Sequence, residues 1–127
     1  MTQETQLITA AERASNQAYA PYSRVAKGAA LETTDGAIYA AGNIEFATYG
    51  GSICAEMAAL AAAINDGKQQ FKRIALSPYR YPCGNCRQAL SEFGMDLTII
   101  TKRDDDQIEQ QELAQLLPET FGKAHLG

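Results

Sequence analysis

The spacing of hydrophobic and polar residues changes along the chain, and each change marks a predicted element. Apolar residues recur at helical spacing over about Glu4–Tyr19, which predicts an amphipathic helix that ends before Pro21. Two apolar runs, Lys27–Thr33 and Ala37–Gly42, flank an Asp-Gly pair. Asp-Gly between apolar runs is a strong hairpin signal, so the pattern predicts two antiparallel strands here.

Helical and strand patterns alternate in the rest of the chain, after a Gly- and Thr-rich loop. The expected elements are a loop at Asn43–Ile53, an Ala-rich helix at Ala55–Asp66, a strand at Phe71–Ser77, a helix at Gly84–Phe93, a strand at Leu97–Thr101 and a last helix at Glu109–Leu117. A further strand near Gln107–Gln110 is too polar to be favoured. Strands that alternate with helices after a hairpin predict one mixed sheet covered on both faces, an α/β/α sandwich of three layers.

Composition limits the kinds of protein and partner that fit this pattern. The length of 127 residues predicts a single domain, residues 1–127, and 46% hydrophobic with 20% charged residues is typical of a globular protein. The net charge of -4 disfavours a protein that binds nucleic acid by neutralising phosphates. No apolar run approaches the ~20 residues of a membrane span, and the first ten residues lack a signal-peptide pattern. We therefore expect a small-molecule substrate and no membrane partner.

The candidate chemistry lies in the three cysteines. Cys54 is followed two residues later by Glu56, and Cys83 and Cys86 form a Cys-x-x-Cys pair. Three thiolates can hold zinc and leave one corner of a tetrahedron open, which is the arrangement that a catalytic zinc uses for water. Glu56 is close enough to move protons without binding the metal. The sequence therefore predicts a zinc-dependent deaminase with one Zn²⁺ per chain, in a reducing cytoplasm that keeps the thiols free.

The predicted helices explain how these thiols can be ionised. All three cysteines stand where a helix is expected to begin, and the free N–H groups of a helix N-terminus lower the pKa of a thiol. Three thiolates with Zn²⁺ still carry a net negative charge, which weakens the metal as a Lewis acid. Arg87, directly after Cys86, is the best candidate to withdraw charge from the sulfurs.

Other interpretations of the cysteines are weaker. Cys83 and Cys86 alone would fit a redox pair, but Cys54 and Glu56 complete a metal set. A purely structural zinc normally has four protein ligands, and the chain has no fourth cysteine. Its one histidine, His125, is expected to be a solvated residue of the C-terminal tail. A non-catalytic module in which zinc only ties two helices together stays open as an alternative, and a nucleic-acid deaminase is disfavoured by the acidic balance.

At this point the residues resemble a known family, the small single-domain cytidine deaminases, over nearly the whole chain; the zinc-deaminase signature itself is a described pattern. The matching stretches follow in family order: Tyr22-Ser23-Arg24, Gly28-Ala29-Ala30-Leu31, Gly42-Asn43-Ile44-Glu45, Ala47-Thr48-Tyr49-Gly50, Ile53-Cys54-Ala55-Glu56, Pro82-Cys83-Gly84-Asn85-Cys86-Arg87-Gln88, and Leu116-Leu117-Pro118 with Phe121. The resemblance implies a cytidine-deaminase-like fold and conversion of cytidine or 2'-deoxycytidine to the uridine product with release of ammonia, a step of pyrimidine salvage.

The resemblance also implies roles for individual residues. Asn43 and Glu45 would hydrogen-bond the ribose hydroxyl, and Ala55 with Glu56 would address the edge of the pyrimidine. The family is usually a homotetramer in which neighbouring subunits complete each site.

Tyr49 and Phe121 match positions that reach into an adjoining site of such a tetramer. Read as single residues, both fit core or interface aromatics equally well.

Three departures from the family pattern bear on the substrate. Val25 stands where the family has a phenylalanine that forms a wall of the base pocket, Met57 stands where a second arginine is common, and the segment Ser77–Tyr81 is shorter than usual. Blasticidin S deaminases share the first two departures. A deaminase of a modified cytosine nucleoside, or of another amino-heterocycle, is therefore the alternative to cytidine.

Overall fold

The computed structural model describes residues 2–126 and contains one five-stranded mixed sheet. Its strands, in chain order, are β1 (Gly28–Thr33), β2 (Ile38–Gly42), β3 (Phe71–Ser77), β4 (Thr98–Lys102) and β5 (Ile108–Glu112). They lie in the order β2-β1-β3-β4-β5, and only the β3–β4 pair is parallel. The α-helices are α1 (Gln3–Ser15), α2 (Ala55–Asn65), α3 (Gly84–Ser91) and α4 (Leu113–Leu116).

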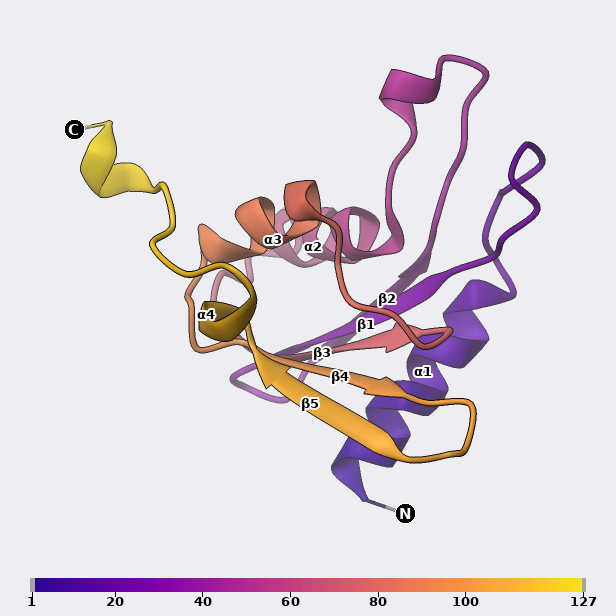
Figure 1. Ribbon diagram of the computed structural model, residues 1–127, viewed down its shortest axis with the longest axis horizontal. Coiled ribbons are helices and arrows are strands. Elements are labelled where there is room, and N and C mark those ends of the chain that lie inside the picture. Colours follow the sequence, from indigo (N-terminus) through magenta and orange to yellow (C-terminus); the bar gives the residue numbers. More distant parts are fainter. Residues whose placement is uncertain (1, 127) are drawn as a thin grey trace.

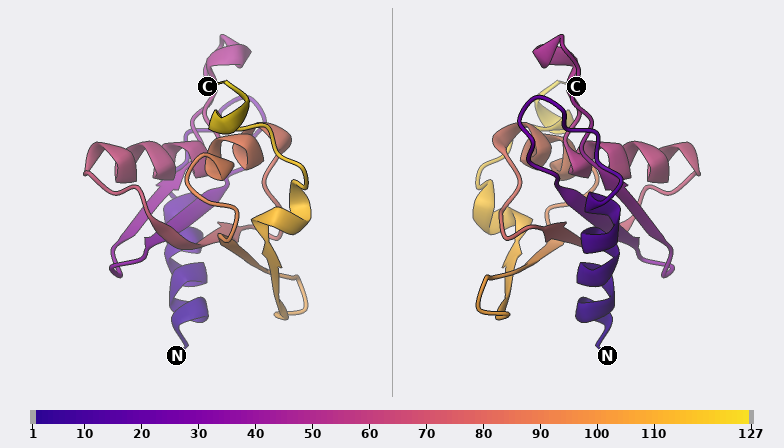
Figure 2. Two further views of the ribbon diagram at one scale, coloured as in Figure 1. Left: turned by 90° about the vertical axis from the view of Figure 1, so that its left-hand side faces the viewer. Right: turned by 90° about the vertical axis from the view of Figure 1, so that its right-hand side faces the viewer.

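Helices cover both faces of the sheet, which confirms the predicted three-layer α/β/α sandwich. Figure 1 and Figure 2 show α1 on one face and α2 with α3 on the other. The strands serve both layers because successive side chains point to opposite faces. In β3, Ile74 and Leu76 join the core beneath α2 and α3, whereas Ala75 joins Leu7 and Ala11 of α1.

The hairpin of β1 and β2 forms where the sequence predicts it. Gly36 has φ +91°, a left-handed conformation that glycine adopts without steric cost. At the other end of β1, a Cβ on Gly28 would lie 2.0 Å from the carbonyl oxygen of Ala11. Glycine at this position therefore lets α1 pack directly on the backbone of β1, and it fixes the end of the strand next to Lys27, which lines the pocket described below.

The predicted last helix is wrong over most of its length. Residues 109–112 of the expected Glu109–Leu117 helix belong to β5, and α4 keeps only Leu113–Leu116. The strand that the sequence allows near Gln107–Gln110, but does not favour, is present as β5. β5 is an edge strand, so its polar side chains can face solvent while its backbone pairs with β4.

The first helix is also shorter than expected, since α1 ends at Ser15 and not near Tyr19. Tyr19 instead bridges to Ile44, and Ile44 bridges to Ile53. The loop that follows β2 is thereby tied to the segment after α1. Figure 1 shows this loop projecting from the sandwich, with the short 3-10 helix η1 (Tyr49–Gly51) at its tip. A second 3-10 helix, η2 (Lys123–His125), lies in the C-terminal tail.

No helix within residues 2–126 combines the length and the apolar character needed to cross a membrane.

Candidate active site

The three cysteines meet at the N-termini of two helices. Cys54 caps α2, Cys83 caps α3, and Cys86 lies in the first turn of α3. Their sulfurs all lie within 4.8 Å of one another, although Cys54 is about thirty residues from the others in sequence. The structure thus brings together the group that the sequence predicts, at the predicted helix ends.

The environment of these thiols favours a bound cation. Burial raises the pKa of the Cys86 thiol well above its ordinary range, and the charges of Glu56 and Cys54 add to the rise. Burial likewise raises the pKa of Cys54. Burial acts in the same direction on Cys83, but the backbone N–H of Cys86 and its thiol overcome it, and the pKa of Cys83 is lowered. Without a cation, three thiolates cannot coexist here with Glu56, because like charges in a buried site repel.

The donor set fits zinc. Three sulfurs at this separation suit ligands that bind one zinc ion at about 2.3 Å. The group that could hold a metal contains no other residue among those described, which leaves a position for water or substrate. His125 is not a ligand: it stacks on Phe121 in the tail, and its Nδ1 accepts a hydrogen bond from the N–H of Gly122.

Glu56 is the second residue of α2 and is almost fully buried, at 2% exposure. Its Oε2 forms an ion pair with Arg80, while its Oε1 is buried and has no hydrogen-bond partner. A buried carboxylate oxygen without a partner is costly unless a ligand supplies one. The free Oε1 therefore marks the place where Glu56 can exchange a proton with a bound molecule.

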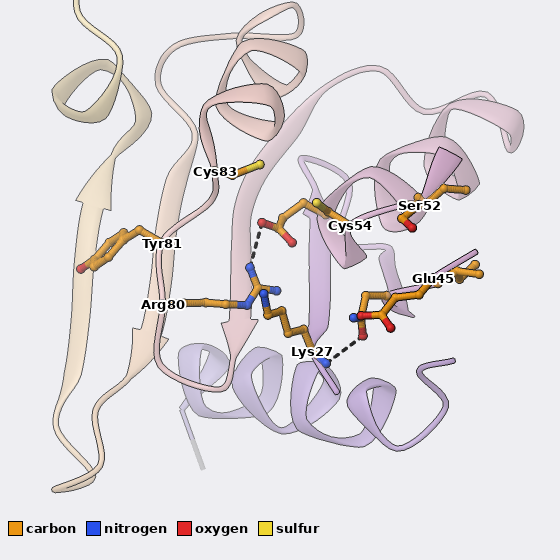
Figure 3. Close-up of a pocket in the computed structure, with 11 residues that line it drawn as sticks. Lys27, Glu45, Ser52, Cys54, Arg80, Tyr81 and Cys83 are labelled. Atoms are coloured by element: carbon orange, nitrogen blue, oxygen red, sulfur yellow. Dashed lines mark hydrogen bonds and ion pairs between the residues drawn. The ribbon is translucent and has the colours of Figure 1, made fainter. Parts of the chain in front are cut away.

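Sequence reasoning missed Arg80. Its Nη1 lies 2.8 Å from Oε2 of Glu56, and its side chain is only 16% exposed. Arg80 lies in the short segment between β3 and α3, which the sequence marked only by its length. Figure 3 shows Arg80 entering the pocket from that segment, opposite Cys54. A local motif could not reveal the contact, since the two charges come from different elements.

Arg87, by contrast, makes its hydrogen bonds to backbone oxygens. Its Nε donates to the carbonyl of Pro82 (2.7 Å) and its Nη1 donates to the carbonyl of Leu116 (2.9 Å). Arg87 thus braces the residue before Cys83 against the C-terminal segment. Its predicted effect on the charge of the thiolates stays a prediction.

A pocket of about 340 Å³ connects the metal group with the loop after β2. Cys54, Cys83 and Glu56 line one end of it, and Asn43 and Glu45 line the other. The predicted metal and sugar residues are therefore the two ends of a single pocket.

Asn43 is buried, and its amide is already in use. Its Oδ1 accepts a hydrogen bond from the backbone N–H of Lys27 (2.9 Å), and its Nδ2 donates to the carbonyl of Val25 (3.2 Å). The side chain therefore clamps the entry to β1. Only its remaining hydrogen-bonding capacity can meet a substrate.

Glu45 is held by the segment after α1. Its Oε1 accepts from the backbone N–H groups of Tyr22 (3.1 Å) and Ser23 (3.0 Å), and its Oε2 accepts from the hydroxyl of Ser23. The Ser23 hydroxyl, followed by the Ser23 N–H, lowers the pKa of Glu45. Glu45 is thus an ionised, oriented acceptor at the pocket wall.

Lys27 is a second pocket residue that the sequence did not indicate. It lines the pocket, and Figure 3 shows its side chain pointing toward Arg80. Within residues 2–126 its ammonium group forms no ion pair or hydrogen bond. The pocket therefore offers a free cation to a ligand.

Val25 stands where the resemblance implies an aromatic wall, and within residues 2–126 the pocket lining turns no aromatic ring toward the metal end. Val25 is 46% exposed, and the aromatic side chain among the pocket residues is Tyr81. Figure 3 shows the Tyr81 ring directed away from Arg80 and Cys54, and its hydroxyl donates to Glu109 of β5 (2.8 Å). Burial and this bond raise the pKa of Tyr81 to about 12.

The remaining predicted substrate residues lie outside this pocket. Ala55 is buried at the start of α2, between two residues that line the pocket. Tyr49 is 74% exposed and meets Tyr22 edge to face, with ring centroids 6.0 Å apart. Phe121 is 54% exposed, and its carbonyl accepts from Nε2 of Gln88.

Comparison with known proteins agrees with this site. A protein family described as "Cytidine and deoxycytidylate deaminase zinc-binding region" matches residues 1–102. The cytidine deaminase of Sporosarcina psychrophila is 41% identical over 94% of this chain and 92% of its own length. Two crystal structures of cytidine deaminases are similar throughout. That from Burkholderia pseudomallei has a TM-score of 0.87 and 38% identity and covers 95% of this chain and 100% of its own. That from Mycobacterium tuberculosis has a TM-score of 0.85 and 34% identity, with 96% and 99% coverage.

The match includes all three cysteines, Glu56 and the loop that carries Asn43 and Glu45, so it covers every part of the pocket described above. The chain belongs to the cytidine and deoxycytidylate deaminase family and contains its zinc-binding region.

Proposed function

We propose that this protein is a zinc-dependent hydrolase that converts cytidine or 2'-deoxycytidine and water to the uridine product and ammonia. The observation that carries the proposal is the pairing of three clustered thiols with a buried carboxylate whose Oε1 is free. The names of its relatives support the same substrate class.

Cys54, Cys83 and Cys86 hold the zinc in this proposal. The ion, when bound, supplies a Lewis acid that lowers the pKa of a coordinated water toward neutrality. Glu56 takes up one proton of the water at Oε1 and delivers it to the ring nitrogen of the base, then takes up the second proton of the water and delivers it to the departing amino group. One carboxylate thus serves as general base and general acid in turn.

The other end of the pocket holds the sugar. Glu45 is fixed by Ser23 and Tyr22, so it can accept from a ribose hydroxyl without further ordering. Asn43 adds its spare amide capacity, and the first turn of α2, with Ala55, offers backbone groups to the pyrimidine edge. Preformed acceptors of this kind reduce the entropy lost on binding.

The decisive experiment measures ammonia release from cytidine by the zinc-loaded protein, with Glu56→Gln as the matched variant. Glutamine keeps the shape of the side chain but cannot take up a proton. We expect kcat to fall by about 10²- to 10⁴-fold while zinc content and fold are kept. Equal turnover by the two proteins would reject Glu56 as the proton carrier, and no turnover by the unaltered zinc-loaded protein would favour a zinc-stabilised module.

A second candidate substrate is a modified cytosine nucleoside of the blasticidin S kind. The observation that favours it is the absence of an aromatic ring facing the metal end in the described part of the chain, which leaves room for a larger base. Comparing kcat/KM for cytidine, 2'-deoxycytidine, free cytosine and a bulky cytosine nucleoside separates the two. A preference for the bulky nucleoside would make it the substrate.

We further propose that the protein is a homotetramer in the cytoplasm and acts in pyrimidine salvage. Tyr49 and Phe121 are exposed and lie outside the pocket of their own chain, which suits residues that complete a neighbour's site. Three free thiols suit a reducing compartment. Light scattering gives the assembly state directly. A monomer with full activity would remove Tyr49 and Phe121 from the site.

A further inference from the structure

We propose that Arg80 is a positioning residue of this deaminase, which holds one oxygen of the Glu56 carboxylate and leaves the other to face the substrate. The inference rests on the proposed function, since it assigns Arg80 a part in the same reaction. It starts from a contact that the sequence does not mark and that none of the predicted roles includes.

The two oxygens of Glu56 have different surroundings. Oε2 lies 2.8 Å from Nη1 of Arg80, whereas Oε1 is buried without a partner. Exchanging the two oxygens would require the ion pair to break inside a pocket where Glu56 is 2% exposed. Arg80 therefore fixes the rotation of the carboxylate and determines which oxygen can transfer protons.

Arg80 is itself anchored to the sheet at both ends. Its backbone N–H donates to Oγ1 of Thr101 on β4 (3.2 Å), and its Nη2 donates to the carbonyl of Gly28 on β1 (3.3 Å). Thr101 is fully buried and donates in turn to Leu76 of β3. Because α1 packs directly on Gly28, this end of β1 cannot move outward. The orientation of Glu56 is thus set by rigid elements, as precise catalytic geometry requires.

The negative groups around Glu56 also favour a cation at the position of Arg80. The carboxylate is buried beside three thiols, Met57 offers no charge, and Arg87 donates to carbonyl oxygens. Lys27 lines the same pocket without contacting Glu56. Arg80 is the cation in residues 2–126 that forms an ion pair with this carboxylate. A buried charge without such a partner is strongly disfavoured.

The chain contains a matched ion pair that has no part in the pocket. Arg73 of β3 and Glu32 of β1 are joined by an Nε–Oε1 contact of 2.7 Å, and their side chains are 12% and 14% exposed. This pair resembles Arg80–Glu56 in distance and in the burial of the arginine. Breaking it should therefore cost comparable stability without touching the reaction.

The test compares Arg80→Gln, Arg80→Lys and Arg73→Gln in the zinc-loaded protein, with kcat and KM for cytidine, zinc content and thermal midpoint measured for each. We expect Arg80→Gln to lower kcat by about 100-fold, with a smaller change in KM and zinc retained. Arg80→Lys should recover part of this loss, because lysine keeps the charge but lacks the second nitrogen that reaches Gly28. Arg73→Gln should lower the thermal midpoint and leave kcat unchanged.

Two results would overturn the inference alone. Wild-type kcat in Arg80→Gln, with a thermal midpoint lowered as in Arg73→Gln, would make Arg80 a structural ion pair only. If Arg80→Gln does not fold, wild-type kcat in Arg80→Met, which keeps the apolar stem and removes the charge, would overturn it instead. Failure of the proposed function is separate, because the unaltered protein would then release no ammonia from any cytosine nucleoside.

Discussion

The two ends of the pocket are built in opposite ways. At the metal end, Cys54 and Cys83 cap helices that are packed on the sheet, and Glu56 keeps one oxygen without a partner. At the other end, which we propose holds the sugar and call the sugar end, Asn43 and Glu45 sit on a projecting loop, and their side chains already bond to neighbouring segments. The metal end has unused bonding capacity on rigid supports. At the sugar end, the hydrogen bonds of these side chains hold the loop in place.

The two ends differ because reacting groups and recognition groups need different supports. Groups that react must be held still and yet be free to bond, which packed helices and strands permit. Groups that recognise a sugar can lie on a loop if hydrogen bonds hold the loop in shape, as Ser23 holds Glu45. Changes at the metal end should therefore affect kcat and metal content, and changes at the sugar end should affect KM and the stability of the loop.

The largest effect is expected from Cys86→Ser. Cys86 is fully buried, and a serine oxygen is a poor replacement for a thiolate on zinc. Zinc should be lost on dialysis and turnover should become undetectable. Metal analysis of the purified variant checks this, with Ser91→Ala at the far end of α3 as the control that keeps both. Retention of zinc by Cys86→Ser would remove it from the ligand set.

A smaller effect is expected from Glu45→Gln at the sugar end. A hydrogen bond to a charged acceptor contributes about 1.5–3 kcal/mol, so KM should rise by roughly 10- to 100-fold. Zinc content should not change, and kcat should change less than KM. Glu109→Gln, which alters a carboxylate that does not line the pocket and that accepts from the hydroxyls of Tyr79 and Tyr81, should leave KM as it is. A fall in kcat at constant KM would contradict the assignment of Glu45 to the sugar.

Asn43→Ala should act on stability as well as on KM. The change leaves the Lys27 N–H and the Val25 carbonyl without their partner, at a cost of about 1–3 kcal/mol for a buried group. Chemical denaturation measures this cost. A normal free energy of unfolding with a raised KM would show that Asn43 serves the substrate alone.

The smallest expected effect is a shift in the pKa of Glu45. The Ser23 hydroxyl lowers the pKa of Glu45 below its ordinary value of 4.5. The bond from Ser23 to ionised Glu45 therefore stabilises the folded state above about pH 4.5. This stabilisation is lost as the pH falls through the lowered pKa of Glu45 in the folded state. Ser23→Ala should move the pKa of Glu45 back upward in an NMR titration. Asp35, whose pKa Lys68 and Thr33 lower to about 2, should titrate unchanged.

Much of the fold could be predicted because its signals are local. The hairpin of β1 and β2 follows from its Asp-Gly turn, and the bounds of β3 match the predicted Phe71–Ser77. β5 could not be predicted in this way. Its residues are polar and favour a helix by composition, but the free edge of β4 offers backbone partners that only the folded sheet presents.

In the site, too, the residues with local sequence signals could be predicted and the others could not. Cysteine spacing and the carboxylate two residues after Cys54 were sufficient to predict the metal group and Glu56. Arg80 was not predictable, since it is 24 residues from Glu56 and reaches it only because β3, β4 and β1 bring their ends together.

The sequence by itself determined the chemistry of this protein, because ligand type, spacing and helix N-termini are properties of short segments. Only the tertiary structure decided the electrostatic surroundings of that chemistry. It directed Arg87 to backbone carbonyls, Arg80 to Glu56 and Lys27 into the pocket. The physical reason is that charges act over the distances of the folded chain, which the order of residues does not specify.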